Sequence, residues 1–206
     1  MIPALNDLVR RMTLKEDVKN SDDSISWHAY REAEKLADHS YIGELNNFVE
    51  VSPSKEERKA AYFILGAIGT NTADARCAQI LLKRASLETD KYVLSALLGS
   101  VAKLPKPTEL PLEAIFLLLH EKRWLVRHAA IQALRQSESA GAEDRLLELL
   151  ATTSDPHDKF YCHCTLNNIG THRSIPLLTQ SLTSRKRDVK FSAEAAIAAI
   201  QARHST

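Results

Sequence analysis

The densest group of side chains that could bind a metal lies between residues 157 and 172. Its members are His157, Cys162, His163, Cys164 and His172. Zinc sites use such thiolates and imidazoles, with at least two residues between paired cysteines. Cys162 and Cys164 have a single residue between them, and on a helix such a pair points to nearly opposite sides. We therefore expect no metal here, and we expect Cys162 to be a small core residue.

Catalytic motifs are missing elsewhere too: the sequence has no serine nucleophile elbow, no phosphate-binding loop and no H-E-x-x-H pair. A carboxylate beside an aromatic ring, as a glycosylase requires, occurs among the predicted surface residues at Glu194 and Phe191. Because this pair lies in the last of several helical segments and not in the middle of them, glycosylase-like activity is a minor alternative. Lyase-like activity is a second minor alternative. The sequence predicts a protein without enzymatic activity and without a cofactor.

The composition indicates a helical protein, and its net charge argues against strong, indiscriminate binding to phosphates. The 206 residues include 44% apolar and 26% charged residues, only 6 glycines, and a net charge of +1. Residues 1–53 carry −4 and residues 54–206 carry +5. The three cysteines lack framework spacing and indicate free thiols in a reducing compartment. With no signal peptide or membrane-spanning stretch evident, we expect a cytoplasmic protein.

A repeat of about 32 residues organises most of the chain. Five segments open with a basic residue, and successive openings are 33, 36, 32 and 31 residues apart. These basic anchors are Arg58, Lys91, Arg127, Lys159 and Lys190. Each segment has Leu or Ile at its eighth place and an i, i+3, i+4, i+7 apolar stripe, which is typical of an amphipathic helix. Among these residues we expect Leu65, Leu98, Leu134 and Leu166 to be buried between hairpins.

A second helical pattern precedes each segment, at 41–51, 73–85, 112–121, 142–151 and 174–182. Ser54 with Glu57 has capping-box spacing, and Asp155 precedes a proline at a first helical position. Gly69 and Gly170 are expected as left-handed residues just after helix ends. Residues 3–18 and 24–39 predict two further helices, so we expect divergent capping helices over 1–40 and one continuous array over 41–206.

The stretch from Leu166 through Gly170 to Pro176 resembles the HEAT repeat, in the variety first noted in phycobilin lyases. Residues 124–134 are similar to the second helix of the same unit. The resemblance implies an all-α, right-handed α-solenoid of about five to six hairpins, with Asp158 and Asp188 as candidate acidic partners of the basic anchors. It implies little about function, because such repeats serve unrelated tasks.

The second helices of such repeats commonly line a concave binding surface. Reading their non-stacking places gives a strip that mixes aromatic, His, Asn, Gln and Arg side chains, a composition typical of protein interfaces. The predicted protein-binding residues are Lys59, Tyr62, Tyr92, His128, Gln132, Arg135, Phe160, His163, Asn167, Phe191 and Glu194. Alternatively, Tyr92, Phe160 and Phe191 belong to the core.

The basic anchors form a predicted edge that could neutralise successive phosphates of a nucleic acid. The residues of this edge are Arg58, Lys91, Arg127, Lys159, Arg185, Lys186, Arg187 and Lys190. In the other interpretation, which we favour, each anchor pairs with an acid or caps a helix end. The sequence thus predicts a monomeric, non-enzymatic scaffold or adaptor that holds a partner protein, for example an immunity-type or regulatory protein. A nucleic-acid-binding protein, repair-related for instance, is the alternative.

Overall fold

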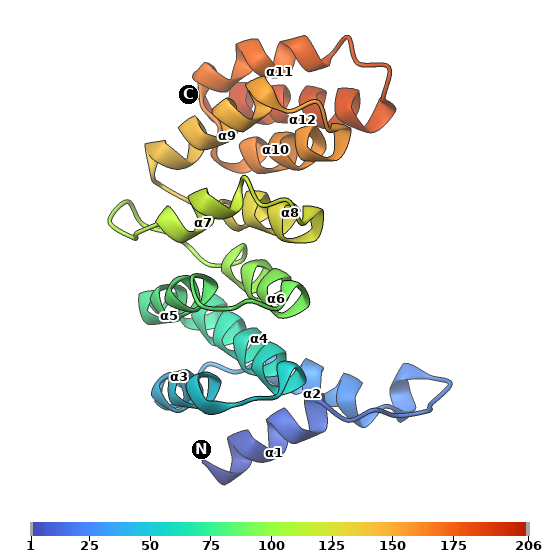
Figure 1. Cartoon of the computed structure of the whole chain (residues 1–206), viewed down its shortest axis with the longest axis vertical. Coiled ribbons are helices and arrows are strands. Elements are labelled where there is room, and N and C mark those ends of the chain that lie inside the picture. The colour runs from blue at the N-terminus through green and yellow to red at the C-terminus, as the bar shows by residue number, and fades with distance from the viewer. Residues whose placement is uncertain (1, 205–206) are drawn as a thin grey trace. The chain divides into compact units, whose positions relative to one another are not determined.

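Paired helices make up most of the chain in the computed structural model, which describes residues 2–204 (Figure 1). The chain divides into two compact units, Met1–Pro105 and Lys106–Thr206. Unit 1 contains α1 (Pro3–Met12), a 3₁₀ turn (Ser21–Asp23), α2 (Ile25–Ala33), α3 (Ser40–Val51), α4 (Lys55–Thr72), α5 (Ala75–Ala85) and α6 (Lys91–Val101). Unit 2 contains α7 (Glu113–Leu118), α8 (Trp124–Ala133), α9 (Ala140–Thr152), α10 (Pro156–Ile169), a 3₁₀ turn (His172–Ser174), α11 (Ile175–Ser181) and α12 (Arg187–His204).

Each unit is built from stacked helical hairpins, as the repeat predicts. In unit 1, α3 packs against α4 and α5 against α6, while α4 also packs against α6. In unit 2, the pairs α7–α8, α9–α10 and α11–α12 stack through their second helices, so that α10 lies against both α8 and α12. The helices α1 and α2, expected as a cap, pack on α4 within unit 1. The division between the units falls in the proline-containing insertion that lengthens one repeat.

Local signals in the sequence set several helix starts. The Ser54 side chain accepts a hydrogen bond from the backbone N–H of Glu57. The Asp155 side chain likewise accepts from the backbone N–H of His157, and Pro156 between them is the first residue of α10. Asp74 and Asp90 cap α5 and α6 in the same way. These caps satisfy backbone donors that a helix start leaves without a partner, so the turns before the second helices have defined geometry.

The prediction that Gly69 and Gly170 are left-handed is wrong. Helix α4 continues through Gly69 to Thr72, and the left-handed residue that follows is Ala73, with φ 54°. A Cβ atom at Gly69 would lie 2.7 Å from the Cβ of Cys77. Gly170 has φ −65°. At Gly69, therefore, glycine is needed for close approach of α5 to α4 and not for a turn.

Helix α8 ends at Ala133, earlier than the periodic pattern predicts. Gln136 adopts φ 56°, and its carbonyl accepts a 2.9 Å hydrogen bond from the N–H of Lys106. The N–H of Glu138 in turn donates to the carbonyl of Lys106 at 2.9 Å. This short bridge takes up backbone groups that would otherwise continue the helix. Within residues 2–204 it is the sole β-type pairing, and no strand is formed.

The apolar core confirms the predicted stripe. Leu65, Leu98, Leu134 and Leu166 are all 0% exposed. Cys162 is also fully buried, as expected of a small core residue, and Cys77, Cys162 and Cys164 are free thiols. None of the described helices combines the length and apolar content needed to cross a bilayer.

Replacing Leu134 by alanine should lower the free energy of unfolding by about 2–5 kcal/mol, because the change leaves a cavity in a fully packed site. The exposed Leu117 of the same unit offers a matched control, and Leu117→Ala should change that free energy by less than about 0.5 kcal/mol. Urea titration followed by far-ultraviolet circular dichroism measures both. Equal losses in the two variants would contradict the assigned packing.

Candidate binding site

The Arg127 guanidinium organises one edge of unit 2 by joining two successive hairpins. Its Nε donates to both carboxylate oxygens of Asp158 on α10, at 2.9 and 3.0 Å. Its Nη2 lies 3.3 Å from Oδ2 of Asp155, and its Nη1 donates to the carbonyl of Glu121 at 2.8 Å. One side chain of α8 thus fixes both the turn before its own helix and the start of the next second helix.

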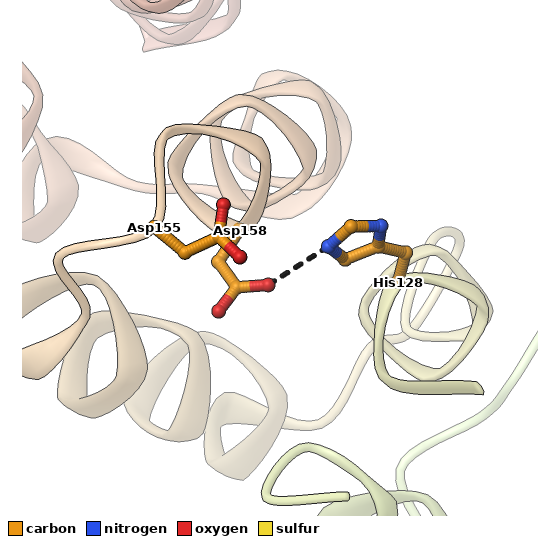
Figure 2. Close-up of side chains that lie close together, drawn as sticks. All are labelled: His128, Asp155 and Asp158. Atoms are coloured by element: carbon orange, nitrogen blue, oxygen red, sulfur yellow. Dashed lines mark hydrogen bonds and ion pairs between the residues drawn. The ribbon is translucent and has the colours of Figure 1, made fainter. Parts of the chain in front are cut away.

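His128 is held beside this ion pair. Its Nε2 lies 2.9 Å from Oδ1 of the buried Asp158, as Figure 2 shows. Burial lowers the pKa of His128, against the opposing effect of Asp158, so the ring is neutral near pH 7. Because an ionised Asp158 can only accept, Nε2 carries the ring proton and Nδ1 is left as an acceptor. The His128 ring lies 4.6 Å from the Tyr161 ring between centroids and 5.7 Å from that of Trp124.

These rings surround a pocket of about 520 Å³, which we call the aromatic pocket. It is lined by Trp124, His128, Asp155, His157 and Tyr161. A second hollow of about 430 Å³ adjoins it and shares His157 and Tyr161. The other residues of this second hollow are Pro156, Phe160, Lys186, Asp188 and Val189. The volumes lie in the range of sites that bind small molecules or single side chains.

The ligand atoms of His128, Asp155 and Asp158 lie within 4.8 Å of one another, a spacing that could hold a metal ion (Figure 2). The oxygens of Asp158, however, already accept hydrogen bonds from Arg127, from His128 and from the Thr153 hydroxyl at 3.0 Å. The Arg127 guanidinium also lies against both carboxylates. A cation would have to displace that guanidinium, so this geometry gives no reason to propose a metal.

The structure separates the predicted surface strip into exposed and buried residues. Tyr92 and Phe191 are 60% and 53% exposed, and Glu194 is exposed beside Lys190. Lys59, Gln132, Arg135, Phe160 and Asn167 are half-buried. Tyr62 and His163 are 2% and 0% exposed, so their prediction as contact residues is wrong. His128 is 7% exposed and reaches the surface through the aromatic pocket.

His163 is buried because it belongs to a polar cluster inside the hairpin stack. Its Nδ1 lies 2.9 Å from the Ser192 hydroxyl on α12, and its Nε2 lies 3.1 Å from the Ser181 hydroxyl at the end of α11. Helical periodicity placed this residue on the open face, whereas two hydroxyls on neighbouring helices hold it inward. Helical periodicity does not determine whether a histidine is buried when hydroxyls on neighbouring helices can form hydrogen bonds with both of its ring nitrogens.

The predicted basic edge also divides into two kinds of residue. Arg58 and Arg127 are half-buried, and Arg58 pairs with Glu88 through two hydrogen bonds of 2.9 and 3.2 Å. Lys91, Arg185, Lys186, Arg187 and Lys190 are exposed, and Lys159 is half-buried. Of the two candidate acidic partners, Asp158 is confirmed by its pair with Arg127, whereas Asp188 is exposed at the second hollow.

Sequence reasoning missed Trp124, Asp155, His157 and Tyr161 as site residues. Tyr161 occupies a place that the repeat assigns to stacking, and Trp124 precedes the basic anchor. Asp155 was read as a helix cap, which it is. The available signal was the departure from the repeat, since an exposed tryptophan three residues before an anchor occurs in no other segment.

Comparison with known proteins places the chain among all-α helical-repeat proteins. Two engineered proteins align over nearly the whole chain. A structural-genomics design has 21% identity, covers 98% of each chain and gives a TM-score of 0.54. A designed armadillo repeat protein has 18% identity, covers 95% of this chain and 99% of its own, and also gives 0.54. At these identities the likeness concerns the fold alone.

The family model of HEAT repeats matches residues 112–198. The match runs from the start of α7 into α12, ending at residue 198, and includes all of the aromatic pocket. No curated protein matches the sequence. The predicted resemblance to HEAT repeats is thereby confirmed for residues 112–198, and so is the all-α repeat fold.

Asp158→Asn should lower the free energy of unfolding of unit 2 by on the order of 3 kcal/mol, because it removes the buried one of the two carboxylates that pair with the largely buried Arg127 guanidinium. Glu148→Gln provides the control, since it breaks an exposed ion pair with Arg145 and should cost less than about 1 kcal/mol. Chemical denaturation of both variants measures the difference. A cost for Asp158→Asn no larger than that of the control would contradict a structural role for the pair.

Stability should also fall in acid because burial lowers the pKa of His163 to about 4. Between about pH 6.5 and about pH 4, the His163 imidazole binds a proton in the unfolded chain but not in the folded chain. The folded state therefore has its full stability above about pH 6.5 and loses part of it as the pH falls toward about 4. The loss should approach about 3 kcal/mol. The free energy of unfolding, measured by chemical denaturation at about pH 7 and at about pH 4.5, should differ less between the two pH values in His163→Gln than in the wild type. The exposed His120 gives the control His120→Gln, which should keep the wild-type difference.

Proposed function

We propose that the chain is a non-enzymatic scaffold that holds a partner protein against α8, α10 and α12 of unit 2. The observation that carries this proposal is the exposure of large rings beside two hollows. Trp124 is 63% exposed and Phe191 is 53% exposed, and Tyr161 and Phe160 line the hollows between their helices. Aromatic side chains that lie together around a pocket are typical anchors of protein interfaces.

Two carboxylates favour a protein over a nucleic acid as the partner. Asp155 lines the aromatic pocket, and Asp188 lines the second hollow. Each would repel a phosphate placed on these surfaces. Arg58 and Arg127, two members of the predicted phosphate-binding edge, are already paired with carboxylates. Discrete anchoring rings with mixed charges suit the side chains of a protein better than a continuous line of phosphates.

Nucleic-acid binding is the second candidate because basic residues cluster in the turn before α12 and along its first turn. Arg185, Lys186, Arg187 and Lys190 are all exposed. The Arg187 guanidinium lies 5.1 Å from the centre of the Phe191 ring, which a base could join by stacking. In this case affinity for duplex DNA should fall with salt at a log–log slope near −0.9 for each phosphate neutralised.

The proposal predicts that Trp124→Ala combined with Phe191→Ala abolishes capture of a defined partner by the immobilised full-length chain. Both side chains are largely exposed, so the variant should remain folded. Trp27→Ala is the matched control, because Trp27 is a 43% exposed ring in unit 1. Capture from an extract of the source cells, treated with nuclease and identified by mass spectrometry, supplies the measurement. The same protein should be retained by wild type and by the control.

Three outcomes would contradict the proposal. The captured protein could persist on the Trp124→Ala, Phe191→Ala variant, or capture could be lost after nuclease treatment. The third outcome is strongly salt-dependent binding of DNA that a variant with Arg185, Lys186 and Arg187 replaced by alanine abolishes. Either of the last two results would make the nucleic-acid candidate the better account.

A further inference from the structure

The aromatic pocket has the chemistry of a site for an organic cation. Four rings and one carboxylate line it, and no Lys or Arg side chain is among the lining residues. Ring faces attract cations through their quadrupole, and most strongly the face of tryptophan. The Asp155 side chain is 36% exposed, and its oxygens accept hydrogen bonds from the backbone N–H groups of His157 and Asp158 and from Arg127 at 3.3 Å. A carboxylate has about four lone-pair sites, so these three donors leave room for one more.

The charges around the pocket also favour a cation. Asp155 and Asp158 contribute two negative charges, Arg127 contributes one positive charge, and burial keeps His128 neutral near pH 7. The cluster therefore carries one uncompensated negative charge. The helix cap made by Asp155 does not neutralise this charge, because the backbone N–H of His157 that donates to it is uncharged.

The equivalent position in unit 1 holds a cation supplied by the chain itself. Lys55 stands three residues before the anchor Arg58, as Trp124 stands three residues before Arg127. The Lys55 ammonium lies 2.6 Å from Oδ2 of Asp90, which caps α6 as Asp155 caps α10. A helix-capping carboxylate thus binds an ammonium group in unit 1, whereas in unit 2 the residue three places before the arginine anchor is an aromatic ring.

We propose that the aromatic pocket binds the guanidinium or ammonium group of an arginine or lysine side chain presented by the partner. This inference rests on the proposed function and gives the partner's anchoring residue. The cation lies between the faces of Trp124 and Tyr161 and donates hydrogen bonds to Asp155. In this arrangement the partner supplies to unit 2 the positive charge that Lys55 supplies to unit 1.

The test is an NMR titration of the full-length chain with N-acetyl-arginine amide, followed through the ring resonances of His157 and Tyr161. N-acetyl-citrulline amide has nearly the same shape without the charge, and it should bind at least about tenfold more weakly. Asp155→Asn keeps a good helix cap and should weaken arginine binding by about tenfold. Asp188→Asn, which changes the carboxylate of the second hollow, should leave binding unchanged. Trp124→Lys should abolish it by placing an ammonium group in the pocket, as in unit 1.

Equal binding of the citrulline and arginine compounds would overturn the inference, and so would full binding by Asp155→Asn or the absence of any saturable shift. These results are independent of the capture experiment. If arginine binds as described while capture survives the loss of Trp124 and Phe191, the pocket is a cation site and the proposed scaffold function fails. If capture depends on those rings while charge makes no difference to the titration, the scaffold function stands and the cation site fails.

Discussion

The hydrogen-bonded pairing of an arginine with a carboxylate in the next hairpin is the interaction on which the rest of the structure depends. Arg58 binds Glu88 and the carbonyls of Ser52 and Pro53 in unit 1. Arg127 in unit 2 binds Asp158 and the carbonyls six and five residues before it. Apolar packing alone tolerates sliding of one helix along another. A planar guanidinium with fixed donors sets the position of each hairpin against the next.

In unit 2 this pairing also builds the site. Arg127 holds Asp155 and Asp158, and Asp158 in turn orients the ring of His128 against Tyr161. The pocket walls are therefore fixed by an interaction that the fold already requires. A pre-oriented set of rings costs less conformational entropy on binding than flexible surface side chains would. The structural role and the proposed binding role of this edge are consequently difficult to separate by changing Arg127 or Asp158, whereas Trp124 and Asp155 lie outside the buried pair of Arg127 and Asp158.

The sequence was sufficient to predict the helices, the repeat length and the buried leucines, because each depends on periodicity that neighbours in the chain determine. It was insufficient where partners distant in sequence decide. His163 is drawn inward by Ser181 and Ser192, and Gly69 serves the approach of Cys77. The pocket required knowledge that Trp124, Asp155 and Tyr161 converge from two hairpins. The register within one helix does not determine which residues of the next hairpin lie opposite.

Residues that recur at the same place in the repeats are those that stability requires. A residue that departs from this pattern therefore indicates a role other than stability. Unit 1 meets that requirement with Lys55 paired to Asp90, and Lys59 stands where unit 2 has His128. Unit 2 has a tryptophan, Trp124, at the place of Lys55 three residues before the arginine anchor, and its side chain is 63% exposed. This replacement gives up an ion pair and exposes a large apolar surface, and neither change benefits the isolated fold. A partner that covers the ring and pairs with the carboxylate would offset this cost, which is why we propose that binding takes place on unit 2.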